Sequence, residues 1–265
     1  MTATSWLLLK LAMVAGVVGL ASWVTRRLGH AAGGWMAGLP VIAGPITGLL
    51  LLDLAPALVR EVCLATLQCQ PALMAYLVVM AHAAQRLSWP ACLLLAIGAY
   101  LATGLLLLAL ALPAATALVL ALASPALGLL VMPRQARQAA AGPVPLDRTE
   151  LLARMLVACL VAAGVMLGAQ HLAAAWAGLL LAAPIAGLVL PAFTLPRHGG
   201  PATAALLAGF ARGQVGFVVF FAAMVLALPR LAPLPAWLGS VASAVLAGWA
   251  WTRWQGRRAA ARRGR

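Results

Sequence analysis

The chain has 265 residues, of which 65% are hydrophobic and 8% are charged. Soluble domains contain about 45–50% apolar and about 25% charged residues, so this composition excludes a soluble globular protein and predicts an integral membrane protein. The formal net charge is +14. Because the arginines are spread over short segments between apolar stretches and over the C-terminus, they indicate membrane topology, and we expect no nucleic-acid partner.

The apolar segments predict an all-α, polytopic fold. A helix that spans a bilayer needs about 20 mainly apolar residues. Segments of this kind cover residues 5–24, 35–53, 61–84, 90–111, 114–132, 151–170, 172–192, 202–228 and 232–252. We therefore expect about nine, at most ten, transmembrane helices.

The arginines also predict an orientation. If the N-terminus lies outside, thirteen arginines fall on the cytoplasmic side and only Arg60 and Arg230 fall on the other. Positively charged loops stay in the cytoplasm, so we expect an N-out, C-in protein of the bacterial inner (cytoplasmic) membrane. The basic tail, residues 254–265, would then lie against anionic lipid headgroups.

Two segments of the chain resemble each other, which predicts a duplication. Residues 45–51 read Pro-Ile-Thr-Gly-Leu-Leu-Leu, and residues 184–190 read Pro-Ile-Ala-Gly-Leu-Val-Leu. Five predicted helices precede the second copy's first helix, so corresponding helices run in opposite directions and the repeat is inverted. The chain then divides into a first membrane repeat of five helices (1–133), a cytoplasmic linker (134–150), a second membrane repeat of four helices (151–253) and the basic tail (254–265).

Proline and glycine interrupt both copies, at Gly38–Gly48 and Gly178–Pro191. Backbone groups freed at membrane depth must be met by protein, by water in a cavity or by a ligand. The N-terminus of a half-helix also carries partial positive charge, which favours an anion. Matched interruptions in two halves point to a transporter binding site, which we expect to include Gly44, Pro45, Pro184 and Gly187.

Arg212 is the most deeply placed charge in the predicted helices. It stands ten residues from Ala202, so it lies about 15 Å into the bilayer, near the midplane. An arginine there faces the bundle or a water-filled cavity, and its guanidinium suits a carboxylate, sulfate or phosphate. With Gln214 as a neutral neighbour, Arg212 contacts a bound anion or, alternatively, bonds the carbonyls of the broken helices.

Other polar residues in the predicted helices have weaker signals. His82 and Asp53 are candidates for ion coupling, although a local hydrogen bond of His82 and an interfacial ion pair of Asp53 with Arg60 are the favoured alternatives. Lys10 and Arg154 lie within about two turns of helix ends, where long side chains extend to the interface.

Motifs for catalysis are missing from the sequence. It contains no H-E-x-x-H, no G-x-S-x-G and no phosphate-binding glycine loop, and we expect no enzyme. The four cysteines have neither paired spacing nor histidine neighbours, so we interpret them as small buried residues. We therefore expect neither a metal nor a cofactor.

The segment Gly34-Trp35-Met36-Ala37-Gly38-Leu39-Pro40 carries a resemblance. The chain resembles uncharacterised bacterial inner-membrane proteins with a Gly-Trp-x-x-Gly-Leu-Pro segment. In architecture it is similar to inverted-repeat secondary carriers with crossed broken helices. Neither resemblance implies a substrate or a catalytic residue, and the second copy lacks a proline that matches Pro40.

Three functions fit these observations. The first is a secondary transporter of a small anionic solute, which works by alternating access between the two repeats. The second is a non-catalytic subunit of a larger envelope complex, in which small-residue helix faces pack against a partner membrane protein or a second copy. The third is a lipid-handling membrane protein.

Overall fold

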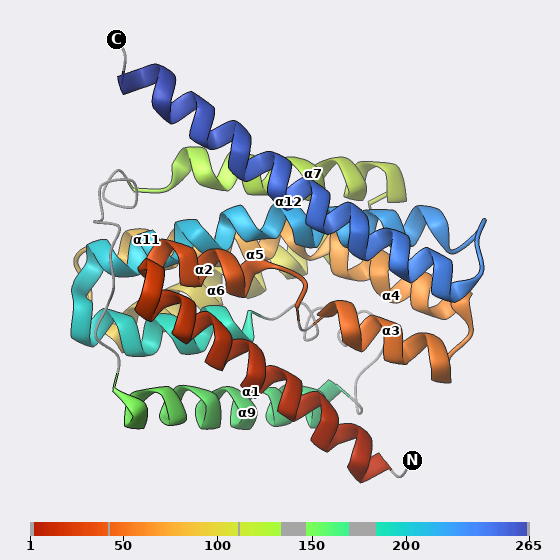
Figure 1. Cartoon of the computed structure of the whole chain (residues 1–265), viewed down its shortest axis with the longest axis horizontal. Helices are drawn as coiled ribbons and strands as arrows, with labels where there is room; N and C mark the ends of the chain where they lie inside the picture. The colour runs from red at the N-terminus through yellow and green to blue at the C-terminus, as the bar shows by residue number, and fades with distance from the viewer. Residues whose placement is uncertain (1–2, 42, 111, 134–146, 170–183, 264–265) are drawn as a thin grey trace.

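The computed structural model describes the chain except for residues 1–2, 42, 111, 134–146, 170–183 and 264–265 (Figure 1). Every regular element in the described residues is a helix. The helices are α1 (Ala3–Leu28), α2 (His30–Gly38), α3 (Ala43–Asp53), α4 (Pro56–Gln68), α5 (Gln70–Ala83), α6 (Trp89–Ala109), α7 (Ala114–Val131), α9 (Arg148–Ala169), α11 (Ile185–Ala227) and α12 (Pro233–Arg263).

The helices are those of a multi-pass membrane protein. Within the described residues, seven segments are long and apolar enough to cross a membrane: Leu11–Leu28, His30–Leu52, Pro56–Ala83, Trp89–Ala109, Ala114–Val131, Ile185–Ala227 and Pro233–Trp251. The all-α class is confirmed. Most of the predicted seventh helix (172–192) lies outside the described residues, as does most of the predicted linker, and residues 254–263 of the predicted tail continue α12.

Helix α11 is 43 residues long but consists of two antiparallel arms (Figure 1). Gly199 joins them with a φ of 76°, which glycine adopts readily because it has no Cβ. We call residues 185–198 the first arm and residues 200–227 the second arm. The turn at Gly199, the turn between α1 and α2, and the start of α9 lie at the left end of Figure 1.

The predicted interruption between Gly38 and Gly48 is present, but Pro40 causes it. A proline keeps the preceding residue out of the helical region, and Leu39 is extended, with ψ of 158°. Helix α2 therefore ends at Gly38, and α3 begins at Ala43. Pro45 lies in the first turn of α3, where its missing N–H leaves no helical bond unmade.

A second interruption divides a helix that the sequence analysis predicted to be continuous over residues 61–84. Helix α4 ends at Gln68, Cys69 has a φ of −81° and a ψ of −7°, and α5 begins at Gln70. Pro71 lacks the N–H that would continue the α4 ladder, so it fits the first turn of a new helix. The junction places Gln70 inside the molecule, where it is 1% exposed.

Helix α2 packs against the second arm of α11 through glycines. Gly34 and Gly38 face Gly209 and Gly213, and a Cβ on any of the four would overlap a backbone carbonyl oxygen of the other helix. This spacing of small residues four apart allows two helix backbones to touch. The small-residue faces are therefore used within the chain, and they hold the broken end of α2 against α11.

The arginines separate towards the two ends of the helices. Arg26 and Arg27 occupy the last turn of α1, at the end where α9 begins. At the other end, Arg60 of α4 donates its Nε–H to the carbonyl of Val225, 3.1 Å away, five residues before Arg230. Arg26 and Arg27 therefore lie at the opposite end of the helices from Arg60.

Candidate functional site

A pair of buried amides closes the broken end of α2. Gln214 of the second arm donates to the carbonyl of Gly38 at 3.1 Å and accepts at 3.2 Å from Gln70 at the start of α5. The last carbonyls of a helix have no partner within it, and a buried carbonyl must find one elsewhere. The amide pair therefore ties together the interruptions of two spans.

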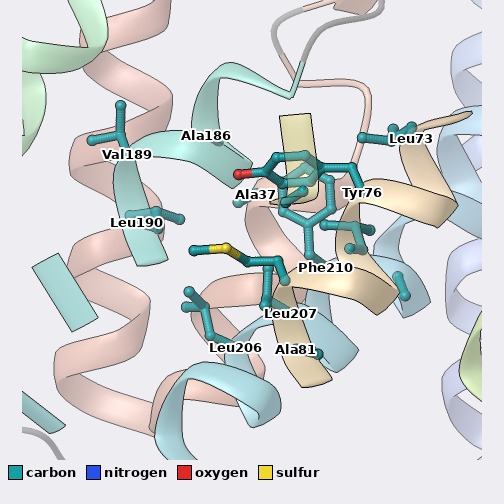
Figure 2. Packing of buried hydrophobic residues seen from close by; sticks show 14 of the residues in the cluster. Ala37, Leu73, Tyr76, Ala81, Ala186, Val189, Leu190, Leu206, Leu207 and Phe210 are labelled. Atoms are coloured by element: carbon teal, nitrogen blue, oxygen red, sulfur yellow. The ribbon is translucent and has the colours of Figure 1, made fainter. Parts of the chain in front are cut away.

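Tyr76 of α5 holds the start of α11. Its hydroxyl donates to the carbonyl of Gly187 at 3.0 Å, and Figure 2 shows its ring between the α2 residue Ala37, Phe210 and Ala186, with the oxygen towards α11. Pro184 precedes the first residue of this helix. In the second predicted interruption, Gly178–Pro191, a helix therefore begins directly after Pro184. The part of this interruption before Pro184 lies outside the described residues.

A cavity of about 470 Å³ lies beside the start of α3. Side chains from the break between α2 and α3, from the second arm and from α12 surround it: Trp35, Leu39, Pro40, Val41, Gly44, Pro45, Phe220, Trp237, Val241, Ala244, Val245, Gly248 and Trp249. Its lining is almost entirely hydrocarbon. Such a volume fits a small organic molecule, because ligand pockets measure about 300–1,000 Å³ and are mostly apolar.

Two of the tryptophans around this cavity have buried indole N–H groups. Trp237 of α12 donates to the carbonyl of Gly44 at 2.8 Å, in the first turn of α3. The Nε1 of Trp35 is buried and has no hydrogen-bond partner in the part of the chain that the structure describes. Indole N–H is only a donor, and that of Trp237 is already used, so the cavity suits a molecule with a mainly apolar body.

The structure does not bring the predicted binding residues together in one pocket. Gly44 and Pro45 line the cavity, whereas Gln214 lies on the amide pair. Pro184 and Gly187 lie at the start of α11 beside Tyr76. Arg212 is partly buried on the second arm and is not among the residues that line the cavity.

The two coupling candidates lie away from this centre. His82 is exposed and its Nε2 is 2.8 Å from the carbonyl of Val131, so it ties α5 to the last residue of α7. Asp53 is the last residue of α3, and its side chain lies outside the described set. Cys63, Cys69 and Cys92 are buried and free, as predicted, and Cys159 is partly buried.

The expectation for Arg154 is wrong. Its side chain is 0% exposed and forms an ion pair with Glu150, with Nη2 at 2.6 Å and Nε at 3.1 Å from Oε1. Arg197 approaches the other oxygen of Glu150 at 3.5 Å. Because Glu150 stands one helical turn before Arg154 and is itself 6% exposed, the arginine finds its partner inside the protein and does not extend to the interface.

Comparison with known proteins adds no assignment. The chain matches no protein-family model, no curated protein and no solved structure.

The residues that sequence reasoning missed are Gln70, Tyr76 and Trp237. Of these, only Gln70 had a local signal, a polar Gln-Cys-Gln-Pro stretch in the middle of an apolar segment.

Proposed function

We propose that the protein is a secondary transporter of a small organic anion, which works by alternating access. The observation that supports this proposal is the cavity at Gly44 and Pro45, beside the place where the span His30–Leu52 breaks near its middle. Irregular backbone at membrane depth is tolerated where it lines a cavity or is buried in protein, and transporters bind their substrates at such discontinuous helices.

The lining narrows the class of solute. An inorganic anion needs several polar partners, and the cavity offers mainly hydrocarbon and indole rings. An organic anion would place its apolar body against the tryptophans. Its charge would be favoured by the positive end of α3 and by Arg212 on the second arm.

The inverted repeat is part of the same proposal. Pro45 and Pro184, the matched prolines, stand in the first turn of α3 and directly before α11. Each matched proline thus lies within two residues of a helix start, and this is what supports a duplicated transporter core with N-out, C-in orientation in a bacterial inner membrane. The gathering of arginines at the α1–α2 end supports that orientation.

The test is uptake into proteoliposomes of three labelled probes: benzoate, octanoate and sulfate. We expect uptake of an organic probe and not of sulfate. Arg212→Ala and Trp237→Ala should each reduce this uptake at least tenfold, while both variants remain monodisperse in detergent. Arg230→Ala, which removes an exposed arginine near the opposite end of the second arm, is the matched control.

Two results would contradict the proposal: no uptake of any probe, or wild-type uptake by Arg212→Ala.

A second function, lipid handling, is favoured by the apolar lining, because an acyl chain fits hydrocarbon and indole surfaces equally well. Transfer of labelled phosphatidylglycerol between leaflets, reduced in Trp237→Ala and unaffected by benzoate, would favour it. Failure of both assays would favour the role of a non-catalytic subunit in a larger complex.

A further inference from the structure

A cluster of basic and acidic side chains lies at the α1–α2 end of the molecule, away from the cavity. His30 begins α2, Glu150 and Arg154 lie in the first two turns of α9, and Arg197 and His198 end the first arm of α11. Along α2 alone, about 12 Å of helix separates His30 from Gly38, where the span breaks. We call these five residues the end cluster.

Two glycines bring the histidines of the end cluster together. Gly29 has a φ of 94° and directly precedes His30, and Gly199 has a φ of 76° and directly follows His198. The two turns meet so that the imidazole ring centres are 4.8 Å apart. Positive φ is readily available only to glycine, so the backbone at both turns is adapted to this contact.

Phe193 joins the arginines to the same place. The guanidinium carbons of Arg154 and Arg197 lie 5.6 Å and 5.8 Å from the centre of its ring. Both arginines thus share one aromatic ring as well as one carboxylate, that of Glu150. The cluster is a packed arrangement of side chains from three helices.

Three buried nitrogen atoms of the end cluster have no hydrogen-bond partner among the described residues. Glu150 uses Oε1 for two bonds from Arg154 and Oε2 for the contact with Arg197. Arg154 Nη1, His30 Nδ1 and His198 Nε2 are buried and have no hydrogen-bond partner among the described residues. Guanidinium can only donate, so at least one of these three atoms requires an acceptor.

The charges of the end cluster also do not balance. Two guanidinium groups face one carboxylate, so one positive charge remains. Arg197 is 52% exposed and is hydrated, whereas Arg154 is 0% exposed. A buried cation with a spare N–H, beside two imidazoles that can donate in the appropriate tautomer, matches a negatively charged acceptor.

We propose that the end cluster binds an oxyanion of the phosphate or carboxylate type. Arg154 Nη1–H and the free ring nitrogens of His30 and His198 donate to it, and the exposed side of Arg197 gives access from the aqueous phase. A dissolved anion and the phosphate of a lipid headgroup share this chemistry. The site does not depend on the transport proposal, because it lies at the end of the helices and uses none of the cavity residues.

The test is binding to the full-length protein in a nonionic detergent. Calorimetry would measure the affinity for inorganic phosphate and for acetate, against sodium chloride at equal ionic strength. In a second arm, mixed micelles with phosphatidylglycerol or with uncharged diacylglycerol would identify a lipid source. Binding in the first arm alone assigns a dissolved anion, and binding in the second alone assigns a headgroup.

Three variants and a control connect binding to the end cluster. Arg154→Lys keeps a positive charge beside Glu150 but removes the Nη1 group and the planar fork of donors, and we expect at least a tenfold loss of affinity. His30→Asn and His198→Asn leave the ion pair untouched, and each should weaken binding at least threefold. The control, Arg86→Gln, removes an exposed arginine of the α5–α6 turn and should bind as the wild type does.

Two outcomes overturn the proposal. Neither phosphate, acetate nor phosphatidylglycerol binds to the wild type, in which case buried water satisfies the three atoms. Alternatively, one of them binds, but all three variants bind it with the affinity of the wild type. Neither outcome predicts a change in the uptake of organic anions, so the two proposals can fail independently.

Discussion

The centre of the molecule and the end cluster both bury polar groups, but they partner them differently. At the centre, the groups are neutral, and Gln214 and Tyr76 each bond a backbone carbonyl near an interruption. At the end, the groups are charged or titratable, and three buried atoms have no partner among the described residues. At the centre, the neutral indole Nε1 of Trp35 also lacks a partner among the described residues. A broken helix needs acceptors and donors from its own chain, whereas unpartnered atoms beside a buried charge indicate a group from outside.

The largest effect should come from removing the only carboxylate of the end cluster. Glu150→Leu leaves Arg154 buried without its counter-charge, and breaking a buried ion pair in this way costs about 3–5 kcal/mol. We expect the free energy of unfolding, measured by detergent titration with circular dichroism, to fall by this amount.

The double variant Glu150→Leu with Arg154→Leu sharpens the same point. Because it buries no lone charge, it should recover most of the loss of stability. If Glu150→Leu alone unfolds as the wild type does, Arg154 is not held by Glu150, and the distinction between the two regions fails.

The second-largest loss of stability should come from disturbing the glycine contact between α2 and the second arm of α11. Gly34→Ala places a methyl group on the carbonyl of Leu206, and backbone cannot give way as a flexible side chain does. Overpacking costs about 1–3 kcal/mol, so the melting temperature should fall clearly. Gly98→Ala in α6 is the control, because nothing lies within 4 Å of the added carbon. Equal melting temperatures for the two variants would show that α2 and α11 can separate.

The fold was largely predictable where a local rule decides it. The spans follow from apolar length, and the break after Gly38 follows from Leu39-Pro40, because proline restricts the residue before it. The turn at Gly199 was visible in its glycine pair. In contrast, the junction at Cys69 was missed because Pro71 in an apolar run also fits the interior of a kinked membrane helix.

The sites were less predictable because their contacts join distant segments. Gln70 meets Gln214 across 144 residues, and no local pattern encodes that pairing. The spacing of Glu150 and Arg154 was visible, since residues four apart share a helix face. Their burial was not, because their neighbours Phe193 and Arg197 lie on another helix, α11. The role of a charged residue in a membrane segment can therefore be assigned only when the residues that surround it in the folded protein are known.

The smallest effect tests the neutral partners at the centre. Gln214→Leu removes the donor to Gly38 and the acceptor for Gln70. An unsatisfied buried group costs about 1–3 kcal/mol, less than a lone buried charge, because an amide is cheaper to desolvate than an ion. Unfolding in the same titration should show this loss, and Gln68→Leu, a change at a partly buried glutamine of α4, should leave the midpoint almost unchanged. If Gln214→Leu costs as much as Glu150→Leu, the amide pair is as indispensable as the ion pair, and charge does not explain the difference between the regions.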